Sequence, residues 1–297
     1  MPPPMPEPEQ SPQRAERVAL LGLAANALLG IGKLAAGILG HSYALIADAA
    51  ESLVDVFGSL LVFAGLRFSR VPADKNHPYG HWRAESLAAL AASQLILLLG
   101  VAVGIGAVRR LISPSPVPAS WTLIVLVGVI ALKETMFRVQ TIEADKLDSP
   151  ALRSEAWHHR SDAITSLAAL VGVAIAVLGG PRYAFFDPLA GLLAAVIVLF
   201  NGVRLARTPI LDLMDTTAPQ IAESAARIAM RDEAVRAVEQ AHARRLGRRY
   251  WIDMHIEVDA SMTVDDAHRT TGRLKEAIRL QIPSVTNVLI HVEPHQP

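Results

Sequence analysis

Hydrophobic positions along the chain fall into six long runs separated by short polar segments. A helix that crosses a bilayer needs about 20 consecutive, mostly apolar residues, because each residue adds about 1.5 Å of length. The segment between the third and fourth runs is rich in proline, which cannot continue a helix. The pattern therefore predicts an all-α bundle of six transmembrane helices, which cover residues 18–39, 43–68, 86–108, 121–136, 156–178 and 186–205.

After Pro209, no run is long enough to span a membrane, and shorter periodic patterns begin. Residues 218–231 have the spacing of an amphipathic helix, and residues 234–242 are compatible with a strand. In residues 249–258, every second side chain is apolar, which is typical of a strand with one buried face. A capping box at 263–266 predicts a helix to about residue 282, and residues 288–292 form the last predicted strand. The order α-β-β-α-β predicts a small α+β domain with its helices on one face of the sheet.

The composition favours an integral membrane protein. Only 19% of the 297 residues are charged, against about 25% in ordinary soluble domains, and the mean hydropathy is +0.33. The formal net charge of zero gives no argument for a nucleic-acid partner, and the absence of cysteine excludes disulfides and thiolate ligands. We expect a disordered tail at 1–13, a six-helix transmembrane domain at 14–208 and a cytoplasmic domain at 209–297.

Lysine and arginine lie mostly in the segments on one side of the predicted membrane. Short cytoplasmic loops carry an excess of these residues, so this side is expected to face the cytoplasm. On the opposite side, the basic residues are Arg109, Arg110 and Arg182. The chain is therefore expected to be a multi-pass protein of the cell membrane, in a bacterium the inner membrane, surrounded by lipid and with both termini cytoplasmic.

Ionisable residues interrupt the second and fifth apolar runs. An ionised aspartate near the centre of a bilayer costs about 2.5–3.5 kcal/mol, so such groups usually face a bundle interior and mark an ion pathway. Glu51 and Asp55 are four residues apart and share a helix face, as do His158 and Asp162. If the two pairs face each other, they provide one nitrogen and three carboxylates, a ligand set that a divalent transition metal accepts.

The same residues have a structural alternative. They could form a buried network of ion pairs that only holds helices together, but Arg160 is the one lysine or arginine expected nearby. Asp48 is left open as either a ligand or a partner of the ligands. His159 points about 100° away from His158 around a helix and is expected at the membrane interface.

Three clusters taken together resemble the cation diffusion facilitator family. They are ESLVD at 51–55, DKNHPYGHWRAE at 74–85 and HHRSD at 158–162, and the resemblance covers about residues 17–294. It implies a metallochaperone-like cytoplasmic domain and a homodimeric exporter, not an enzyme, that moves a divalent cation out of the cytoplasm in exchange for protons. Zinc is the cation most often carried and no bound cofactor is implied. The implied transport ligands are Glu51, Asp55, His158 and Asp162.

Glu51 departs from the family pattern, which commonly has aspartate or histidine at this position. Because glutamate adds a methylene group, the coordination geometry and the metal preference are open. Iron, manganese, cobalt and nickel therefore remain candidates beside zinc.

The resemblance also implies sites outside the membrane. In zinc-transporting members, the loop after the second span holds a second site, which maps to Asp74, His77 and His81. The same loop also fits ordinary turn chemistry. A binuclear cytoplasmic site maps to residues that could instead be plain surface side chains: His242, His255, His268, His291 and Glu293. An ion pair between the membrane and cytoplasmic domains maps to Arg83 and Asp215.

Proton exchange follows from the chemistry of the expected ligands. Ligands bind metal in their deprotonated form, so metal loading expels protons and protonation expels metal, with His158 as the natural exchanger. An intramembrane metal-dependent hydrolase, a passive metal channel and a membrane-bound metal sensor remain alternatives. The sequence contains no His-Glu-x-x-His motif for a hydrolase and no Gly-x-x-x-x-Gly-Lys motif for direct use of ATP.

Overall fold

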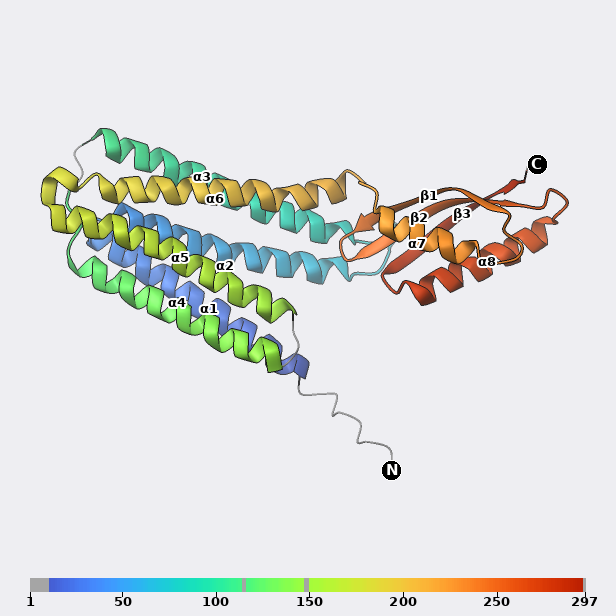
Figure 1. Cartoon of the computed structure of the whole chain (residues 1–297), viewed down its shortest axis with the longest axis horizontal. Helices are drawn as coiled ribbons and strands as arrows, with labels where there is room; N and C mark the ends of the chain where they lie inside the picture. The colour runs from blue at the N-terminus through green and yellow to red at the C-terminus, as the bar shows by residue number, and fades with distance from the viewer. Residues whose placement is uncertain (1–10, 114–115, 147–149, 296–297) are drawn as a thin grey trace, which may run out of the picture. The chain divides into compact units, whose positions relative to one another are not determined.

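The computed structural model describes residues 11–113, 116–146 and 150–295, so residues 1–10 of the tail predicted at 1–13 lie outside the described residues. Within this range, each predicted apolar run forms part of one long helix (Figure 1). These helices are α1 (Ser11–Leu39), α2 (Tyr43–Ser69), α3 (Arg83–Ile112), α4 (Trp121–Lys146), α5 (Pro150–Gly179) and α6 (Phe186–Leu213), with a short 3-10 helix, η1 (Gly180–Tyr183), after α5. Most of the helices extend beyond the apolar runs, and the added residues at their ends are largely polar.

The six helices differ in how long and how apolar they are. Among the described residues, α2, α3, α6 and the stretch Ala156–Tyr183 are each long and apolar enough to cross a membrane. The apolar part of α1 among these residues is shorter, Leu23–Leu39. Helix α4 contains Lys133, Glu134 and Arg138, which lower its mean hydropathy. The predicted fold class, a helical bundle followed by a small α+β domain, is confirmed.

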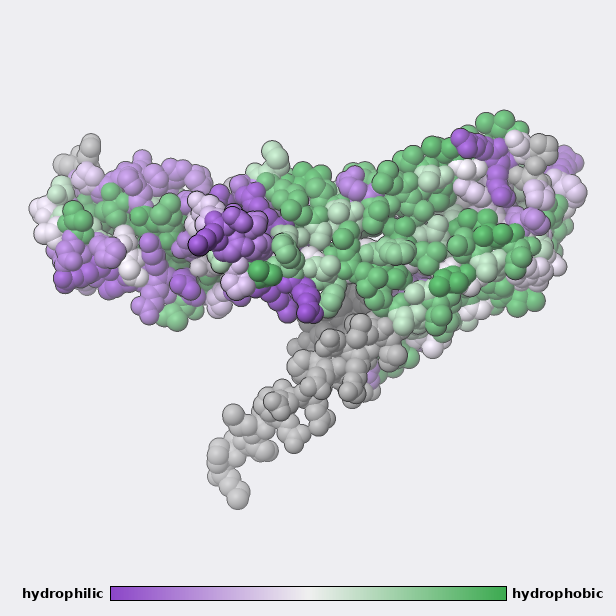
Figure 2. Space-filling view, turned by 180° about the vertical axis from the view of Figure 1, so that it is seen from behind, coloured by the Kyte–Doolittle hydropathy of each residue, from purple (hydrophilic) through white to green (hydrophobic). Residues whose placement is uncertain are grey.

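The chain divides into two compact units. The first contains residues 1–60 and 92–204, and the second contains residues 61–91 and 205–297. Helices α2, α3 and α6 each contribute to both units. Figure 2 shows apolar residues over the surface of the long helices, where Ile124 and Leu178 are 75% and 84% exposed. A surface of this kind is suited to hydrocarbon rather than to water.

In the first unit, α3 and α6 approach closely through glycine. A Cβ atom added at Gly100 would lie 2.8 Å from Leu199, and one added at Gly202 would lie 2.8 Å from Leu97. Real Cβ atoms essentially never make contacts this short. The two glycines therefore allow each helix to receive a leucine of the other, as small residues do in membrane bundles.

The start of α2 is held by α6. Asp187, in the first turn of α6, accepts hydrogen bonds from the backbone N–H groups of Tyr43 (2.6 Å) and Ala44 (3.1 Å) and from the Ser42 hydroxyl (2.7 Å). The first N–H groups of a helix have no partner within the helix, so the carboxylate satisfies them from outside. This cap fixes the beginning of the helix that carries Glu51 and Asp55.

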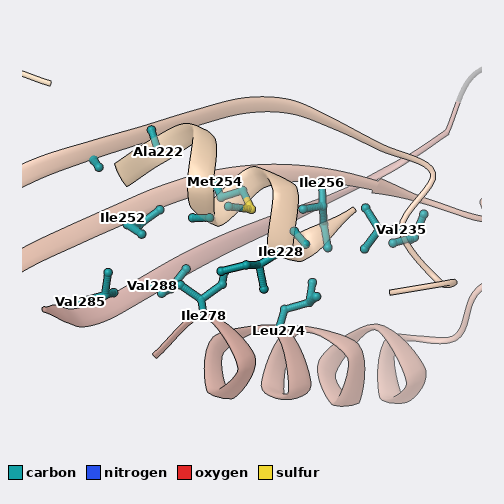
Figure 3. Packing of buried hydrophobic residues seen from close by; sticks show 14 residues of the cluster. Ala222, Ile228, Val235, Ile252, Met254, Ile256, Leu274, Ile278, Val285 and Val288 are labelled. Carbon is teal, nitrogen blue, oxygen red and sulfur yellow. The ribbon is translucent and has the colours of Figure 1, made fainter. Parts of the chain in front are cut away.

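The second unit contains the small α+β domain. Its elements are α7 (Pro219–Ala229), β1 (Ala237–Leu246), β2 (Arg249–Val258), α8 (Val264–Gln281) and β3 (Val285–Pro294). Strand β2 is central, antiparallel to β1 and parallel to β3. Its alternate residues Ile252, Met254 and Ile256 are buried in a core that α7 and α8 complete (Figure 3). Leu274 and Ile278 of α8 belong to this core. Both helices therefore lie on one face of the sheet, as predicted.

The bounds of two strands differ from the prediction. Strand β1 was expected at 234–242, but the chain at Asp232 turns first, where its carboxylate accepts from the Ala234 N–H. The strand begins at Ala237 and runs through Arg244 and Arg245 to the turn at Gly247, which has a φ of 60°. This end of the strand was not predicted, because two consecutive arginines do not show the alternation of apolar and polar residues. Strand β3 is also longer at both ends than the predicted 288–292.

Ion pairs connect the start of α3 to the α+β domain within the second unit. The Arg83 guanidinium lies 2.5 Å from the Asp215 carboxylate, and the Arg248 guanidinium lies 3.4 Å from that of Glu85. These side chains are partly exposed, so each pair contributes little to stability by itself. The first pair connects the start of α3 to the segment after α6, and the second connects it to the turn between β1 and β2.

We predict that Ile278→Ala lowers the free energy of unfolding of the α+β domain by about 2–5 kcal/mol, because it leaves a cavity in the core. Ile278 is fully buried, whereas Leu280 on the same helix is 74% exposed. Leu280→Ala is therefore the matched control and should have little effect. Urea unfolding of the purified full chain, read by the protease susceptibility of this domain, measures both. Equal midpoints for the two variants would contradict the packing described.

Candidate metal centre

Three of the four expected transport ligands lie together inside the first unit. Asp55 comes from the middle of α2, and His158 and Asp162 come from one face of α5. His158 Nε2 lies 3.5 Å from Asp55 Oδ2 and 3.7 Å from Asp162 Oδ2. One ligand atom from each residue lies within 4.8 Å of the others, which is close enough for a shared cation.

The Asp55 carboxylate carries a feature that a structural network does not explain. Its Oδ2 atom is buried and accepts no hydrogen bond from the described residues. A buried carboxylate oxygen without a donor is costly, and a bound cation removes that cost. The donor set of carboxylates and one imidazole fits a divalent transition metal.

Glu51 lies outside this compact group of three. It stands one helical turn before Asp55, and its charge interacts with those of Asp55 and Asp162. The glutamate side chain is longer than that of aspartate and can rotate at an additional bond. Its carboxylate is not among the ligand groups that lie within 4.8 Å of one another.

Two buried lysines contradict the expectation that Arg160 is the one cation near these residues. The Lys133 ammonium, from α4, pairs with Asp162 Oδ2, and both side chains are buried. The Lys33 ammonium, from α1, lies 3.1 Å from Asp48 Oδ1. Arg160 instead stacks over the Phe137 ring, with 4.6 Å between the guanidinium carbon and the ring centroid. The sequence could have predicted these ion pairs, because both lysines interrupt apolar runs and an ammonium group inside a membrane helix needs a carboxylate partner.

Asp48 belongs to the surroundings of the group and not to the group itself. Its carboxylate accepts a hydrogen bond from the Ser166 hydroxyl at 3.0 Å, in addition to the contact with Lys33. Lys33 also donates to the Ser52 hydroxyl at 2.6 Å. These contacts join α1, α2 and α5 next to the candidate ligands.

The expectation that His159 lies at the membrane interface is wrong. The side chain is fully buried, and its Nε2 lies 3.1 Å from the Gln140 side-chain nitrogen on α4. With Gln140 as the donor, Nε2 is the acceptor and the ring proton is on Nδ1. The side chain points toward α4 instead of the membrane interface.

The loop residues Asp74, His77 and His81 form a second compact group, in the second unit. His77 Nδ1 lies 3.1 Å from Asp74 Oδ1, and His81 Nε2 lies 3.7 Å from Asp74 Oδ2. The backbone N–H of His77 donates to the Asp74 carboxylate and lowers the pKa of this group. Turn chemistry and a ligand arrangement therefore occur in the same loop.

A third compact group lies on the polar face of the sheet and contains Glu239, His255 and Glu293. His255 Nδ1 lies 2.9 Å from Glu293 Oε1, and His291 Nε2 lies 3.5 Å from the same oxygen. Sequence reasoning missed Glu239, which the antiparallel pairing of β1 with β2 brings near; its hydrogen bond with Glu293 raises the pKa of Glu239.

The other three histidines of the expected cytoplasmic site are not members of this group, although His291 borders it through Glu293. His242 contacts the Gln240 side chain on its own strand. His268 lines a cavity of about 430 Å³ that Glu293 also borders.

The long apolar helices are those of a multi-span membrane protein, and the donor groups between them form a candidate cation site. Residues 19–214 match the family model described as the cation efflux transmembrane domain, and residues 219–295 match the cation efflux protein cytoplasmic domain. The chain therefore belongs to the cation efflux family, the cation diffusion facilitators.

Several relatives are similar over nearly the whole chain. Metal tolerance protein C1 of Arabidopsis thaliana is 34% identical over 95% of this chain, which spans 63% of that protein's length. Metal tolerance protein 2 of Oryza sativa is 30% identical over 96% of this chain and 80% of its own. Manganese efflux system protein MneP of Bacillus subtilis is 28% identical over 95% of this chain and 97% of its own. A solved structure of the MamM CTD is 27% identical over 26% of this chain and 98% of its own, with a TM-score of 0.25.

We predict that Glu293→Gln weakens zinc binding to the third group by about tenfold or more, because Glu293 contacts both His255 and His291. Glu276→Gln, an exposed site on α8 outside the group, is the matched control. Isothermal titration calorimetry of the purified protein, with Asp55→Asn in the background to remove binding at the first group, measures the change. Equal affinities in the two variants would exclude Glu293 as a ligand.

Proposed function

We propose that this protein exports a divalent transition metal from the cytoplasm in exchange for protons, by alternating access. The observation that carries the proposal is the group of Asp55, His158 and Asp162, in which a buried carboxylate oxygen has no hydrogen-bond donor among the described residues. Ionisable groups inside membrane helices are expensive and usually belong to an ion path. Membership of the cation efflux family favours transport over the hydrolase and sensor alternatives.

Zinc is the first candidate for the cation, because an imidazole with carboxylates is a common zinc ligand set. Manganese is the second candidate. Carboxylates suit this harder cation, and Glu51 adds one next to the group. A relative in Bacillus subtilis is named a manganese efflux protein.

Proton exchange is proposed from the protonation chemistry of the ligands. Asp55, His158 and Asp162 bind metal in their deprotonated forms, so a proton that binds any of them competes with the metal. His158 has a side chain that ordinarily titrates near physiological pH. A difference in pH across the membrane can therefore drive metal release on one side.

The protein is proposed to work as a homodimer in a cell membrane, with both termini in the cytoplasm. The match of residues 219–295 to the cytoplasmic domain of cation efflux proteins supports dimerisation, and the exposed apolar side chains of the long helices suit a lipid environment. In this arrangement, the groups at Asp74 and at Glu293 both face the cytoplasm and are accessible to incoming metal. We propose them as additional metal sites.

We predict that Asp55→Asn lowers metal uptake by about 10–100-fold, because the amide keeps the shape of the side chain and removes its charge. Proteoliposomes that contain a metal-sensitive dye and a pH-sensitive dye measure metal and proton movement together. Glu134→Gln is the control, since Glu134 pairs with Arg138 on the exposed part of α4. Unchanged uptake in Asp55→Asn would reject the site, and metal flux independent of the pH gradient would favour a channel.

Glu51→Asp is predicted to lower the ratio of manganese to zinc uptake. The shorter side chain withdraws a carboxylate from the group, and this loss affects a cation that prefers oxygen ligands more strongly. Uptake of each metal alone by the same proteoliposomes gives the ratio. A ratio equal to that of the wild-type protein would show that Glu51 does not set the preference.

A further inference from the structure

Two lysines are buried in the first unit, and the proposed mechanism does not use them. Lys33 and Lys133 are each 1% exposed, on α1 and α4. A lysine near the centre of a membrane helix is as expensive as an aspartate, and such residues are usually functional. Each lysine pairs with a carboxylate, but the two carboxylates have different roles. Asp162 is a proposed metal ligand, whereas Asp48 lies outside the ligand group.

Lys133 pairs with the Asp162 oxygen atom that lies near His158. Its ammonium pairs with Asp162 Oδ2, and this same atom lies 3.7 Å from His158 Nε2 in the ligand group. A metal ion placed between Asp55, His158 and this oxygen would stand close to the ammonium, with both carrying positive charge. The two cations repel each other strongly in an interior that water does not screen.

The formal charges of the surrounding residues lead to the same conclusion. The carboxylates of this region are the buried Asp48 and Asp162 and the partly buried Glu51 and Asp55, and each interacts with at least one other charged group of the set. With the two ammonium groups and with neutral imidazoles, the formal charge is −2. One divalent cation neutralises it. Without the Lys133 ammonium, the formal charge would be −3, and the site would attract a divalent cation more strongly.

We propose that Lys133 is a tethered cation that occupies the metal's place at Asp162 in the empty transporter and is displaced when the metal binds. This inference rests on the proposed function. Lysine suits the role because its compact charge sits on a flexible four-carbon stem and can move without rearranging the helix. Lys133 is a positioning residue and not a ligand. By competing for Asp162, it lowers metal affinity and favours release.

The test uses the purified full chain in lipid nanodiscs, titrated with zinc alone and with manganese alone. Lys133→Met is expected to lower the Kd by about tenfold or more, because no ammonium competes for Asp162. Metal uptake at saturating metal should fall in the same variant because release becomes slow. Lys133→Arg keeps the charge and should bind metal with nearly wild-type affinity. Lys33→Met is the matched control and should tighten binding less, since its partner is Asp48.

Lys133→Gln keeps the proposal testable if Lys133→Met does not fold, because an amide can still donate a hydrogen bond to Asp162. It should also tighten binding. An unchanged or weaker affinity in the folded Lys133 variants would overturn the proposal, as would equal tightening in Lys33→Met. Asp55→Asn separates the two hypotheses. If it weakens binding while the Lys133 variants do not tighten it, this inference alone fails, and if Asp55→Asn binds normally, the proposed site fails with it.

Discussion

A carboxylate that is ionised inside an apolar helix bundle needs a cation close to it, and this constraint explains the arrangement of the first unit. Asp48 has Lys33, and Asp162 has Lys133. The Asp55 oxygen has no donor among the described residues, and it is the atom that faces His158. Asp48 and Asp162 therefore each have a lysine as partner, and the Asp55 oxygen is left for the proposed metal ion.

The α+β domain obtains its polar cluster from the same alternation that builds its core. Strand β2 directs Ile252, Met254 and Ile256 toward the helices, so its other residues point to the opposite face. Because β3 is parallel to β2, His255 is in register with His291, and their ring centroids are 4.9 Å apart. Histidine and glutamate side chains therefore lie together on this face, while the apolar side chains of the opposite face remain in the core.

Local signals in the sequence predicted most of the elements and pointed to the three candidate ligands that the structure brings together. Apolar runs of sufficient length predicted the six helices, and the Thr263 side chain caps α8 through the Asp266 N–H as the capping box indicated. The spacing of four residues correctly placed His158 and Asp162 on one helix face. The cytoplasmic strands were found where apolar residues alternate clearly and were misplaced where arginines occupy the strand, as in β1.

Contacts between helices could not be predicted in the same way. The positions of Lys133 and His159 depend on how α4 packs against α5, and no periodicity within one helix contains this information. Glu239 joins its group at the irregularity in the pairing of β1 with β2, between Val238 and Gln240. In each case, the sequence states that a buried or polar group needs a partner, but the three-dimensional packing chooses which one.

The cap that Asp187 places on α2 has a mechanical consequence. Because α6 grips the first turn of α2 through three hydrogen bonds, neither helix can slide or rotate alone at that end. The starts of α2 and α6 should therefore move together, and α2 carries Glu51 and Asp55 further along its length. In the proposed transport cycle, a shift of α6 at this end would therefore be transmitted along α2 toward Asp55.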